Sequence, residues 1–567
     1  MKKPVLWAVG ALAAAAAGVA VYLAVSDTPA SDIIGLAAGG GHRELNEPMR
    51  PAGTGPRVII FALDGVGHDE LVGAVREGRA RRMAALLGAP AGEGVYAHGW
   101  AVPDVLSVLP STTVAAWSSL FTGRPPAATG VPGNEWFERE SMRFVAPAPV
   151  SVDGHTDAVA VYADDLVGAT LAVPTLYERA GVRSYVALSQ VHRGADLLIV
   201  PDLGALGSLV TAVAGGVAGG DEMEREKFSV LDEEAVDNTV AALQEHGVPD
   251  LLVVYFPGVD LYTHVAEGPV PSQRSYVGEV LDAGVGRILD VYAAAGMLDD
   301  TWVLFVSDHG HTPVLEDDRH ALGTDGPGEP PAVLQAAGFR VRPFELEPDD
   351  DAQDYQAVLA YQGAMAYVYL ADRSTCVAAG TVCDWRRAPR MDDDVLAVVR
   401  AFAETNRSGA SAPGMMNTLD LILAREPRPP GTDALPFQVW DGDRLVPVAD
   451  YLRQHPRPDL LDLERRLHDL SAGPFGHRAG DVLLLARSGS DRPIEDRFYF
   501  STEYRSWHGS PSQQDSRIPL VVTRRSMAGA AIRETVRTAV GDGPSQIDIV
   551  NLVLRLLRPD GLDEEGP

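Results

Sequence analysis

The sequence predicts an α/β fold with a central, mostly parallel β-sheet flanked by helices. The first observation is three unbroken apolar runs rich in β-branched residues, at 57–63, 251–256 and 302–306. Strands of this kind are buried on both faces, as in a parallel sheet that helices cover. The second observation is a set of helix-like stretches between and around these runs, at 175–180, 233–245 and 275–295. Alternation of strands and helices along the chain is typical of α/β proteins.

The composition is that of a folded protein with an acidic surface. The 567 residues are 46% hydrophobic and 22% charged, and the formal net charge at pH 7 is −31. Such a composition argues against an intrinsically disordered chain. The negative charge also argues against a nucleic-acid duplex as a partner, because its phosphates would be repelled. A small phosphorylated substrate stays compatible with the charge, since bound metal ions reverse the local field.

The N-terminal segment predicts export and contact with a membrane. Lys2 and Lys3 precede a largely apolar run, 4–25, that contains no charged residue. Its length suits the hydrocarbon core of a bilayer, which is about 30 Å thick. We expect residues 1–25 to form an uncleaved signal anchor, with a cleaved signal peptide as the alternative. Because positive charge stays in the cytoplasm, the rest of the chain should be extracytoplasmic, in the periplasm or at the cell surface, membrane-anchored or secreted.

Changes in composition divide the remainder of the chain. Residues 26–56 are rich in Gly, Pro and small polar residues and are predicted to form a linker. The α/β core is predicted in two parts, 57–340 and 501–567, with an apolar run at 517–522 resuming the sheet pattern. Between them, 341–500 carries acidic runs and Pro-rich joints but also apolar, strand-like runs. We therefore expect this stretch to be a folded cap or insertion.

The chain contains two cysteines, Cys376 and Cys383, with six residues between them. In an oxidising compartment, such a close pair is expected to form a local disulfide. Two thiols without neighbouring histidines would make a poor zinc site.

Acidic residues and histidines follow the predicted strands, at the edge where open parallel sheets bind ligands. The candidate metal ligands are Asp64, Asp260, His264, Asp308, His309 and His508. Asp260 and His264 are four residues apart, so a helix would place both side chains on one face. Carboxylates combined with imidazoles suit Zn²⁺, and also Mn²⁺ or Fe. A metal site at this edge is therefore predicted.

A hydroxyl-rich segment, Ser111-Thr112-Thr113, supplies candidate nucleophiles. A hydroxyl group is a poor nucleophile at neutral pH, but a bound metal ion can ionise it. The same residues precede a helix-like stretch and could instead act as its N-cap. The two roles are compatible, because a helix N-terminus also favours an anionic phosphate.

These motifs, in this order, resemble the alkaline phosphatase superfamily, especially its nucleotide pyrophosphatase/phosphodiesterase-like members. The matching elements are Asp64-Gly65, Pro110-Ser111-Thr112-Thr113 with Leu120-Phe121-Thr122-Gly123, Asp260 with His264, Asp308-His309-Gly310, and His508-Gly509. The resemblance implies an alkaline-phosphatase-like fold and two zinc ions per chain. It implies that one ion is held by Asp260, His264 and His508. It implies that the other is held by Asp64, Asp308, His309 and Thr113, the residue that matches the family's nucleophile.

The resemblance also implies an activity, namely hydrolysis of phosphate esters through a phosphothreonine intermediate. Phosphodiester or nucleotide pyrophosphate bonds are favoured as substrates. The segment 130–136 is similar to the Gly-Asn-x-Trp element of phosphate-irrepressible alkaline phosphatases, which implies that Asn134 contacts the substrate phosphate. Arg193 is the best match to the arginine of their Lys-x-Arg pair, and Val191 stands where the lysine would be. Loss of that cationic contact should weaken any preference for the doubly charged monoester.

Other activities remain as alternatives to a phosphodiesterase. They are a phosphate monoesterase and a membrane-anchored phosphoethanolamine-type transferase. A sulfatase is disfavoured because the Cys/Ser-x-Pro-x-Arg motif is absent around Thr113. A non-enzymatic binding protein would require a degenerate site, whereas all seven expected ligand positions are filled. His68, His311 and His320 lie near the motifs and are expected to have supporting or surface roles, and the sequence leaves the oligomeric state open.

Overall fold

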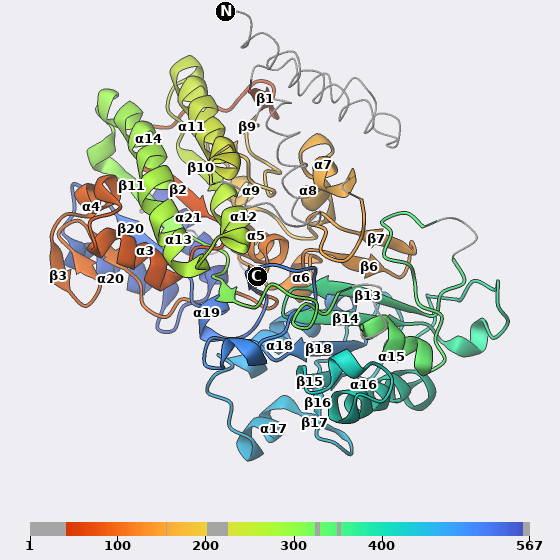
Figure 1. Cartoon of the computed structure of the whole chain (residues 1–567). Helices are drawn as coiled ribbons and strands as arrows, with labels where there is room; N and C mark the ends of the chain where they lie inside the picture. The colour runs from red at the N-terminus through yellow and green to blue at the C-terminus, as the bar shows by residue number, and fades with distance from the viewer. Residues whose placement is uncertain (1–40, 155, 201–224, 324–328, 349–352, 559–567) are drawn as a thin grey trace, which may run out of the picture.

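The computed structural model describes residues 41–154, 156–200, 225–323, 329–348 and 353–558 (Figure 1). The predicted signal anchor or signal peptide, 1–25, lies outside the described residues, as do residues 26–40 of the predicted linker. Among the helices of the described ranges, none is long and apolar enough to cross a membrane.

Ten strands form the central sheet, in the order β1-β9-β8-β10-β2-β11-β20-β5-β4-β3. Their bounds are β1 His42–Glu44, β2 Arg57–Leu63, β3 Pro90–Gly92, β4 Val95–Tyr96, β5 Gly99–Ala101, β8 Ser184–Ala187, β9 Leu197–Ile199, β10 Leu251–Phe256, β11 Thr301–Val306 and β20 Leu520–Thr523. The five strands from β9 to β11 are parallel to one another. The three apolar runs of the sequence are the neighbours β10, β2 and β11, so the prediction of a buried parallel sheet is confirmed.

Helices cover both faces of this sheet (Figure 1). One face carries α3 His68–Arg76, α4 Arg81–Leu87, α11 Glu226–His246, α12 Gly258–Val265, α13 Pro269–Tyr276 and α14 Asp282–Ala294. The other carries α5 Thr113–Thr122, α7 Thr156–Ala163, α8 Leu166–Thr170, α9 Leu176–Ala180, α20 Gly529–Val540 and α21 Ile549–Leu557. Successive residues of β2 enter different cores, since Ile60 packs in the core that contains Trp117 and Phe61 in the core that contains Ile288. Both faces are therefore apolar, which explains why the strand sequences do not alternate.

A second sheet of six antiparallel strands lies wholly within the stretch predicted as a cap or insertion. Its strands are β13 Ala357–Gln362, β14 Met365–Leu370, β15 Leu419–Ala424, β16 Gln438–Trp440, β17 Leu445–Pro447 and β18 Val482–Ala486. Helix α16 (Leu396–Ser408) buries Val398 and Phe402 in a core shared with this sheet. The end of β13 contacts the segment that follows α6 (Pro126–Thr129), where the backbone N–H of Asn134 donates to Gln362 Oε1 at 2.7 Å.

Three further features of the structure can be compared with what the sequence predicted. Cys376 and Cys383 form the predicted disulfide, with their Cα atoms 4.8 Å apart. The predicted linker, 26–56, is not all irregular, because His42–Glu44 forms β1 and pairs antiparallel with β9. The apolar run at 517–522 does contribute a strand, β20, but that strand is antiparallel to β11. Strand direction depends on how the cap returns the chain to the sheet, which residue patterns do not encode.

Candidate active site

Three neighbouring strands bring the candidate ligands together at their carboxyl ends. Asp64 follows β2 directly, Asp308 follows β11 after one residue, and Asp260 lies in the first turn of α12, which begins after β10. Because β10 and β11 flank β2 in a parallel register, these ends meet at one edge of the sheet. Segments that are far apart in the sequence therefore supply a single site.

The first group of ligands, here named the Asp64 cluster, consists of Asp64, Asp308 and His309. His309 Nε2 lies 3.6 Å from Asp64 Oδ1 and 3.2 Å from Asp308 Oδ2. The backbone N–H of Gly65 donates to Asp308 Oδ1 at 3.0 Å, and the Tyr255 hydroxyl donates to Asp64 Oδ2. The remaining carboxylate oxygens, Asp64 Oδ1 and Asp308 Oδ2, are buried and have no hydrogen-bond partner among the described residues. Buried oxygens of this kind are costly unless a cation binds them, so the cluster fits a metal ion.

The second group, here named the Asp260 cluster, consists of Asp260, His264 and His508. As predicted, the four-residue spacing in α12 places Asp260 and His264 side by side, with His264 Nε2 3.4 Å from Asp260 Oδ2. His508 Nε2 lies 3.9 Å from Asp260 Oδ1. All three side chains are buried, and their ligand atoms are close enough to share one ion. One carboxylate with two imidazoles is a donor set that zinc favours.

The cap helps to hold His508 in place. The backbone N–H of Ala364, just after the β13–β14 turn, donates to the His508 carbonyl at 3.0 Å. Gly363 and Gly509 allow the β13–β14 turn and the His508 backbone to come this close. Both glycines have positive φ angles, of 66° and 106°. A Cβ atom on Gly363 would lie 2.3 Å from the His508 carbonyl oxygen, and one on Gly509 would lie 2.1 Å from Gln362 O. Only glycine fits at such positions.

The hydrogen bonds of the three histidines fix their tautomers. In each ring, Nδ1 faces a backbone carbonyl, which can only accept a hydrogen bond. The pairs are His309 with Gly310 O at 3.1 Å, His264 with Ser506 O at 2.8 Å, and His508 with Ser111 O at 3.0 Å. Nδ1 therefore carries the proton, and Nε2 presents a lone pair to the carboxylates. This arrangement is the one that metal-binding histidines adopt.

The electrostatics of the Asp64 cluster also favour a cation. Burial, together with the charges of Asp308 and Asp260, raises the pKa of Asp64 well above its ordinary value. Burial raises the pKa of Asp308 to about 7. Burial also lowers the pKa of His309 to about 3, so its imidazole stays neutral. Two buried carboxyls beside a neutral imidazole need a positive charge nearby in order to ionise together.

His311 also belongs to this region, although the sequence predicted only a supporting or surface role. Its ring is buried, with Nε2 2.8 Å from Asp260 Oδ1 and Nδ1 3.0 Å from Ser506 Oγ. Despite the opposing effect of burial, His264 and His311 hold the pKa of Asp260 well below its usual range. The other two histidines lie elsewhere: the His68 backbone N–H donates to Arg517 O, and His320 pairs with Asp317.

Of the three candidate nucleophiles, Thr113 is the one that faces the clusters. Its Oγ1 lies 3.3 Å from His309 Nε2, and its exposed fraction is 7%, against 0% for Ser111 and Thr112. The Ser111 hydroxyl instead donates to the Ser510 carbonyl at 2.9 Å. Thr112 is the N-cap residue of α5, but its side chain makes no capping hydrogen bond. Thr113 is thus the first residue of the helix, with its hydroxyl beside the Asp64 cluster.

This geometry agrees with a comparison of the sequence with known families. A family model described as type I phosphodiesterase/nucleotide pyrophosphatase matches residues 58–362, which is more than half of the chain. The chain belongs to this family. It is accordingly a phosphoric ester hydrolase. The matched range includes Thr113 and every ligand of the two clusters except His508.

Solved structures similar to this phosphodiesterase family member include phosphonoacetate hydrolase from Sinorhizobium meliloti 1021, in complex with phosphonoformate. That chain is 16% identical, with a TM-score of 0.46, and the match covers 90% of this chain and 97% of that one. Murine ectonucleotide pyrophosphatase/phosphodiesterase 5 is 11% identical, with a TM-score of 0.47 and coverage of 88% and 95%. No curated protein sequence matches the chain.

Asn134 lies beside the N-terminus of α5 in this family member. Its Oδ1 accepts the backbone N–H of Val114 at 2.9 Å, which is the N–H next to the candidate nucleophile. Its Nδ2 has no hydrogen-bond partner among the described residues, so both of its N–H groups can donate to a ligand. The structure thus places Asn134 beside the N-terminus of α5, next to Thr113, and its contact with a phosphate stays a prediction.

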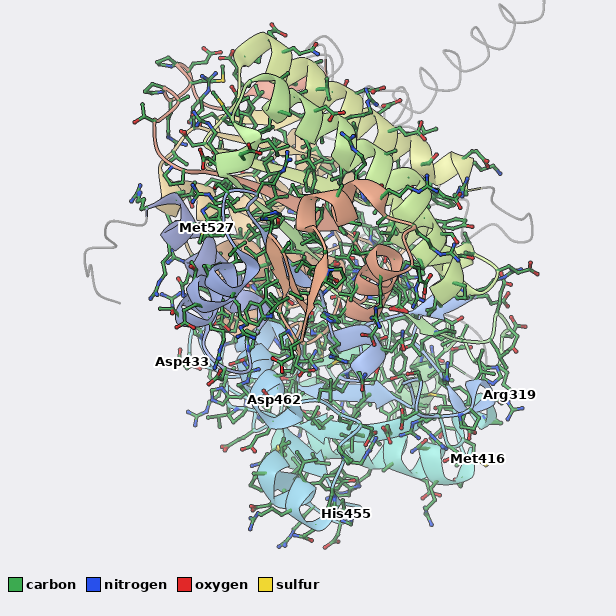
Figure 2. The ribbon with its side chains drawn as sticks, turned by 90° about the vertical axis from the view of Figure 1, so that its left-hand side faces the viewer. Arg319, Met416, Asp433, His455, Asp462 and Met527 are labelled. Atoms are coloured by element: carbon green, nitrogen blue, oxygen red, sulfur yellow. A yellow bond between two sulfur atoms is a disulfide. The ribbon has the colours of Figure 1, made fainter. Side chains whose placement is uncertain are left out.

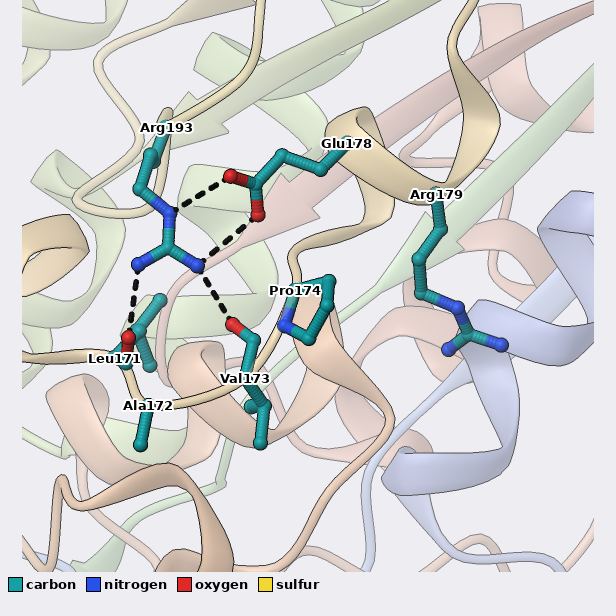
Figure 3. Close-up of a pocket in the computed structure, with 7 residues that line it drawn as sticks. All are labelled: Leu171, Ala172, Val173, Pro174, Glu178, Arg179 and Arg193. Carbon is teal, nitrogen blue, oxygen red and sulfur yellow. Dashed lines mark hydrogen bonds and ion pairs between the residues drawn. The ribbon is translucent and has the colours of Figure 1, made fainter. Parts of the chain in front are cut away.

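The hydrogen bonds of Arg193 go to α9 and to the segment before it rather than to the clusters (Figure 3). Its guanidinium group forms an ion pair with Glu178, at 3.1 and 3.0 Å, and donates to the carbonyls of Gly168, Leu171 and Val173. These contacts use all five N–H donors of the group. In this arrangement, Arg193 holds the segment that precedes α9, and it has no free donor with which to bind a phosphate.

Proposed function

We propose that this enzyme hydrolyses phosphodiester or nucleotide pyrophosphate bonds at a two-zinc site, through a phosphothreonine intermediate on Thr113. The observation that carries the proposal is the placement of the Thr113 hydroxyl 3.3 Å from His309 Nε2, inside the Asp64 cluster. The Asp260 cluster would hold one zinc ion, and the Asp64 cluster with Thr113 would hold the other. Support for zinc comes from the donor set of carboxylates and Nε2 lone pairs and from the unpartnered oxygens of Asp64 and Asp308.

When bound, the zinc ions would supply the Lewis acidity that ionises a hydroxyl at neutral pH and offsets charge on phosphate oxygens. Thr113 gives up its proton to solvent, and its Oγ1 forms a bond to phosphorus. The alcohol or nucleotide group leaves with the electrons of the broken P–O bond and takes a proton from solvent. In the second step, water loses a proton and attacks the phosphorus of phosphothreonine, and the released Oγ1 regains a proton as the Thr113 hydroxyl. Neutral His309 stays oriented throughout by its Nδ1–H bond to the Gly310 carbonyl.

Two features of the chain orient the phosphate group. Helix α5 begins at Thr113, and a helix N-terminus favours an anion through its free N–H groups and its dipole. Asn134 is held by the Val114 N–H, and its Nδ2 is then free to donate to a phosphate oxygen.

The charges near the site support a diester as the substrate. Val191 stands where a lysine would lie in the related monoesterases, and Arg193 is occupied by Glu178 and backbone carbonyls. A dianionic monoester would therefore find two fewer cationic contacts, whereas a monoanionic diester needs them less. Phosphate monoesters remain the second substrate class to compare.

We also propose that the enzyme works outside the cytoplasm, anchored by its N-terminal segment or secreted. Support comes from the apolar run after Lys2 and Lys3 and from the disulfide between Cys376 and Cys383. The protein should then be found in the culture medium, or be digested by protease in spheroplasts whose cytoplasmic membrane is intact. Absence from the medium together with complete protection from protease until the cytoplasmic membrane is lysed would contradict this location.

The activity is tested with purified protein loaded with zinc. We expect hydrolysis of bis-p-nitrophenyl phosphate and of a nucleotide p-nitrophenyl ester to exceed hydrolysis of p-nitrophenyl phosphate in kcat/KM. Thr113→Ala should lower kcat by at least about a thousandfold. The matched control is Thr112→Val, because the Thr112 hydroxyl is buried and makes no hydrogen bond. Full activity in Thr113→Ala would remove Thr113 from the mechanism, and a large monoester preference would overturn the substrate class.

A further inference from the structure

A further group of side chains that could hold a metal ion lies outside the active site, at the edge of the central sheet. This group, here named the edge cluster, consists of His42 in β1 and Glu245 and His246 at the end of α11. His42 Nε2 lies 3.0 Å from His246 Nε2 and 3.8 Å from Glu245 Oε2. The ligand atoms of the three residues all lie within 4.8 Å of one another.

The two imidazoles meet in a way that suits a shared cation. Their rings are nearly perpendicular, at 85°, with centroids 4.8 Å apart, so the two Nε2 atoms point at one another rather than stacking. Two neutral imidazoles can share this contact through one N–H, but then the Glu245 carboxylate faces them without a positive charge. A divalent ion between the three atoms would satisfy both lone pairs and the carboxylate together. Two histidines and one glutamate form a recognised donor set for zinc, with water completing the coordination.

The backbone around the edge cluster is already held in place. The His246 carbonyl accepts hydrogen bonds from Arg183 Nη2 at 2.9 Å and from the Tyr185 hydroxyl at 3.3 Å. His42 is fixed in β1 by its pairing with Ile199 of β9. Ligands that are positioned before an ion binds lose little conformational freedom on binding.

The electrostatics of the edge cluster also favour a cation. His246 is the last residue of α11, and the helix dipole gives this C-terminal end a partial negative charge. The His42 side chain is 17% exposed and that of Glu245 is 63% exposed, so an ion from solvent can reach the ligands.

We propose that His42, Glu245 and His246 bind a zinc ion or another divalent transition-metal ion of similar chemistry, and that this ion fastens β1 to α11. This site is separate from the active site. His246 precedes β10 and Asp260 follows it, so about 20 Å of strand separates the two. The ion would act on the sheet edge, where β1 is only three residues long and pairs with a single strand.

The proposal is tested on the full chain by metal analysis after chelation and reloading with zinc. The double variant His42→Ala/His246→Ala should contain one zinc equivalent fewer than the unmodified chain, whatever number the active site holds. Its kcat/KM should stay within about twofold, which separates this proposal from the proposed function at Thr113. The matched control is His455→Ala, an exposed histidine just after α17 (Val448–Gln454) in the cap (Figure 2). This control should keep the full zinc content.

A second measurement covers the case in which the double variant folds poorly. Glu245→Gln changes an exposed side chain and should weaken zinc binding at the edge cluster about tenfold or more. Added zinc should raise the Tm of the unmodified chain by about 1 °C more than that of Glu245→Gln, because a tenfold change in affinity is about 1.4 kcal/mol and the unfolding entropy of a chain this long is large. Equal zinc content in the unmodified chain and the double variant would overturn the proposal, as would an equal zinc-dependent rise in Tm for Glu245→Gln.

Discussion

His309 and His508 stack face to face in the active site, with ring centroids 3.6 Å apart and ring planes 14° apart. The first belongs to the Asp64 cluster and the second to the Asp260 cluster, so this contact joins the two candidate metal sites. Burial lowers the pKa of His508 well below its ordinary value, and the proximity of His309 lowers it further. Both rings therefore stay neutral and keep their Nε2 lone pairs available to metal ions.

The affinity for zinc should rise with pH up to about pH 7. Burial raises the pKa of Asp308 to about 7 and that of Asp64 well above its ordinary value, so these carboxyls bind protons in the metal-free protein. Zinc must displace those protons, and each displaced proton lowers the affinity about tenfold for every pH unit below the pKa. Calorimetry in buffers of different ionisation enthalpy should detect proton release at pH 6. An affinity that stays constant from pH 6 to 8 would contradict this prediction.

His311 should act by positioning Asp260. Replacing it in His311→Ala removes the contact of 2.8 Å to Asp260 Oδ1, and we expect a loss of about 10–100-fold in zinc affinity. Excess zinc should restore most of the kcat at a temperature well below the Tm of the variant, where loss of folded protein does not contribute. His320→Ala is the matched control, since His320 is also buried and paired with an aspartate, Asp317, but lies outside the clusters. Competition with a chelator measures the affinities, and equal values for the two variants would remove His311 from this role.

Asn134 should contribute to binding of the phosphate group. Asn134→Asp keeps an acceptor for the Val114 N–H but replaces the Nδ2 donor with a negative charge. We expect the inhibition constant for inorganic phosphate and the KM for a diester to rise about 10–100-fold. Asn134→Ala removes the donor without adding charge and should show a smaller rise. Unchanged phosphate inhibition in both variants would show that this side chain does not contact the ligand.

Arg193 should matter for stability rather than for catalysis. Arg193→Ala leaves Glu178 and three backbone carbonyls without their donor, which should lower the free energy of unfolding by about 1–3 kcal/mol. The kcat/KM for a diester should change less than about threefold. Thermal unfolding and steady-state kinetics separate the two roles. A hundredfold loss of activity at an unchanged Tm would instead indicate a phosphate clamp.

The sequence allowed much of the fold and the site to be predicted because the relevant signals are local. The apolar run at 57–63 can be interpreted only as a strand that is buried on both faces. Asp64 follows it directly and therefore lies at the ligand-binding edge of the sheet. The spacing of Asp260 and His264 similarly fixes one helical face. In short segments of this kind, the local sequence alone determines the structure.

What could not be predicted depends on contacts between distant segments. His311 meets Asp260 because the ladder of β12 (Thr312–Pro313) with β19 (Ser506–Trp507) closes over α12, and neither segment signals that pairing in its own sequence. Arg193 matched the Lys-x-Arg motif in the sequence. The direction of its side chain, however, is set by contacts with Glu178 and three backbone carbonyls. Tyr255 lies in a strand whose sequence predicts only a buried apolar core. Its hydroxyl nevertheless donates to Asp64, because the fold brings these two distant segments together.

The central claim is that the two clusters form one two-metal site and that the Thr113 hydroxyl faces one of the two metal ions. The most direct measurement is anomalous X-ray scattering at the zinc edge from crystals of the zinc-loaded enzyme. We expect one peak among Asp64, Asp308, His309 and Thr113 Oγ1, and a second among Asp260, His264 and His508. An absence of anomalous density at both clusters, in crystals of enzyme that is active with zinc, would contradict the account.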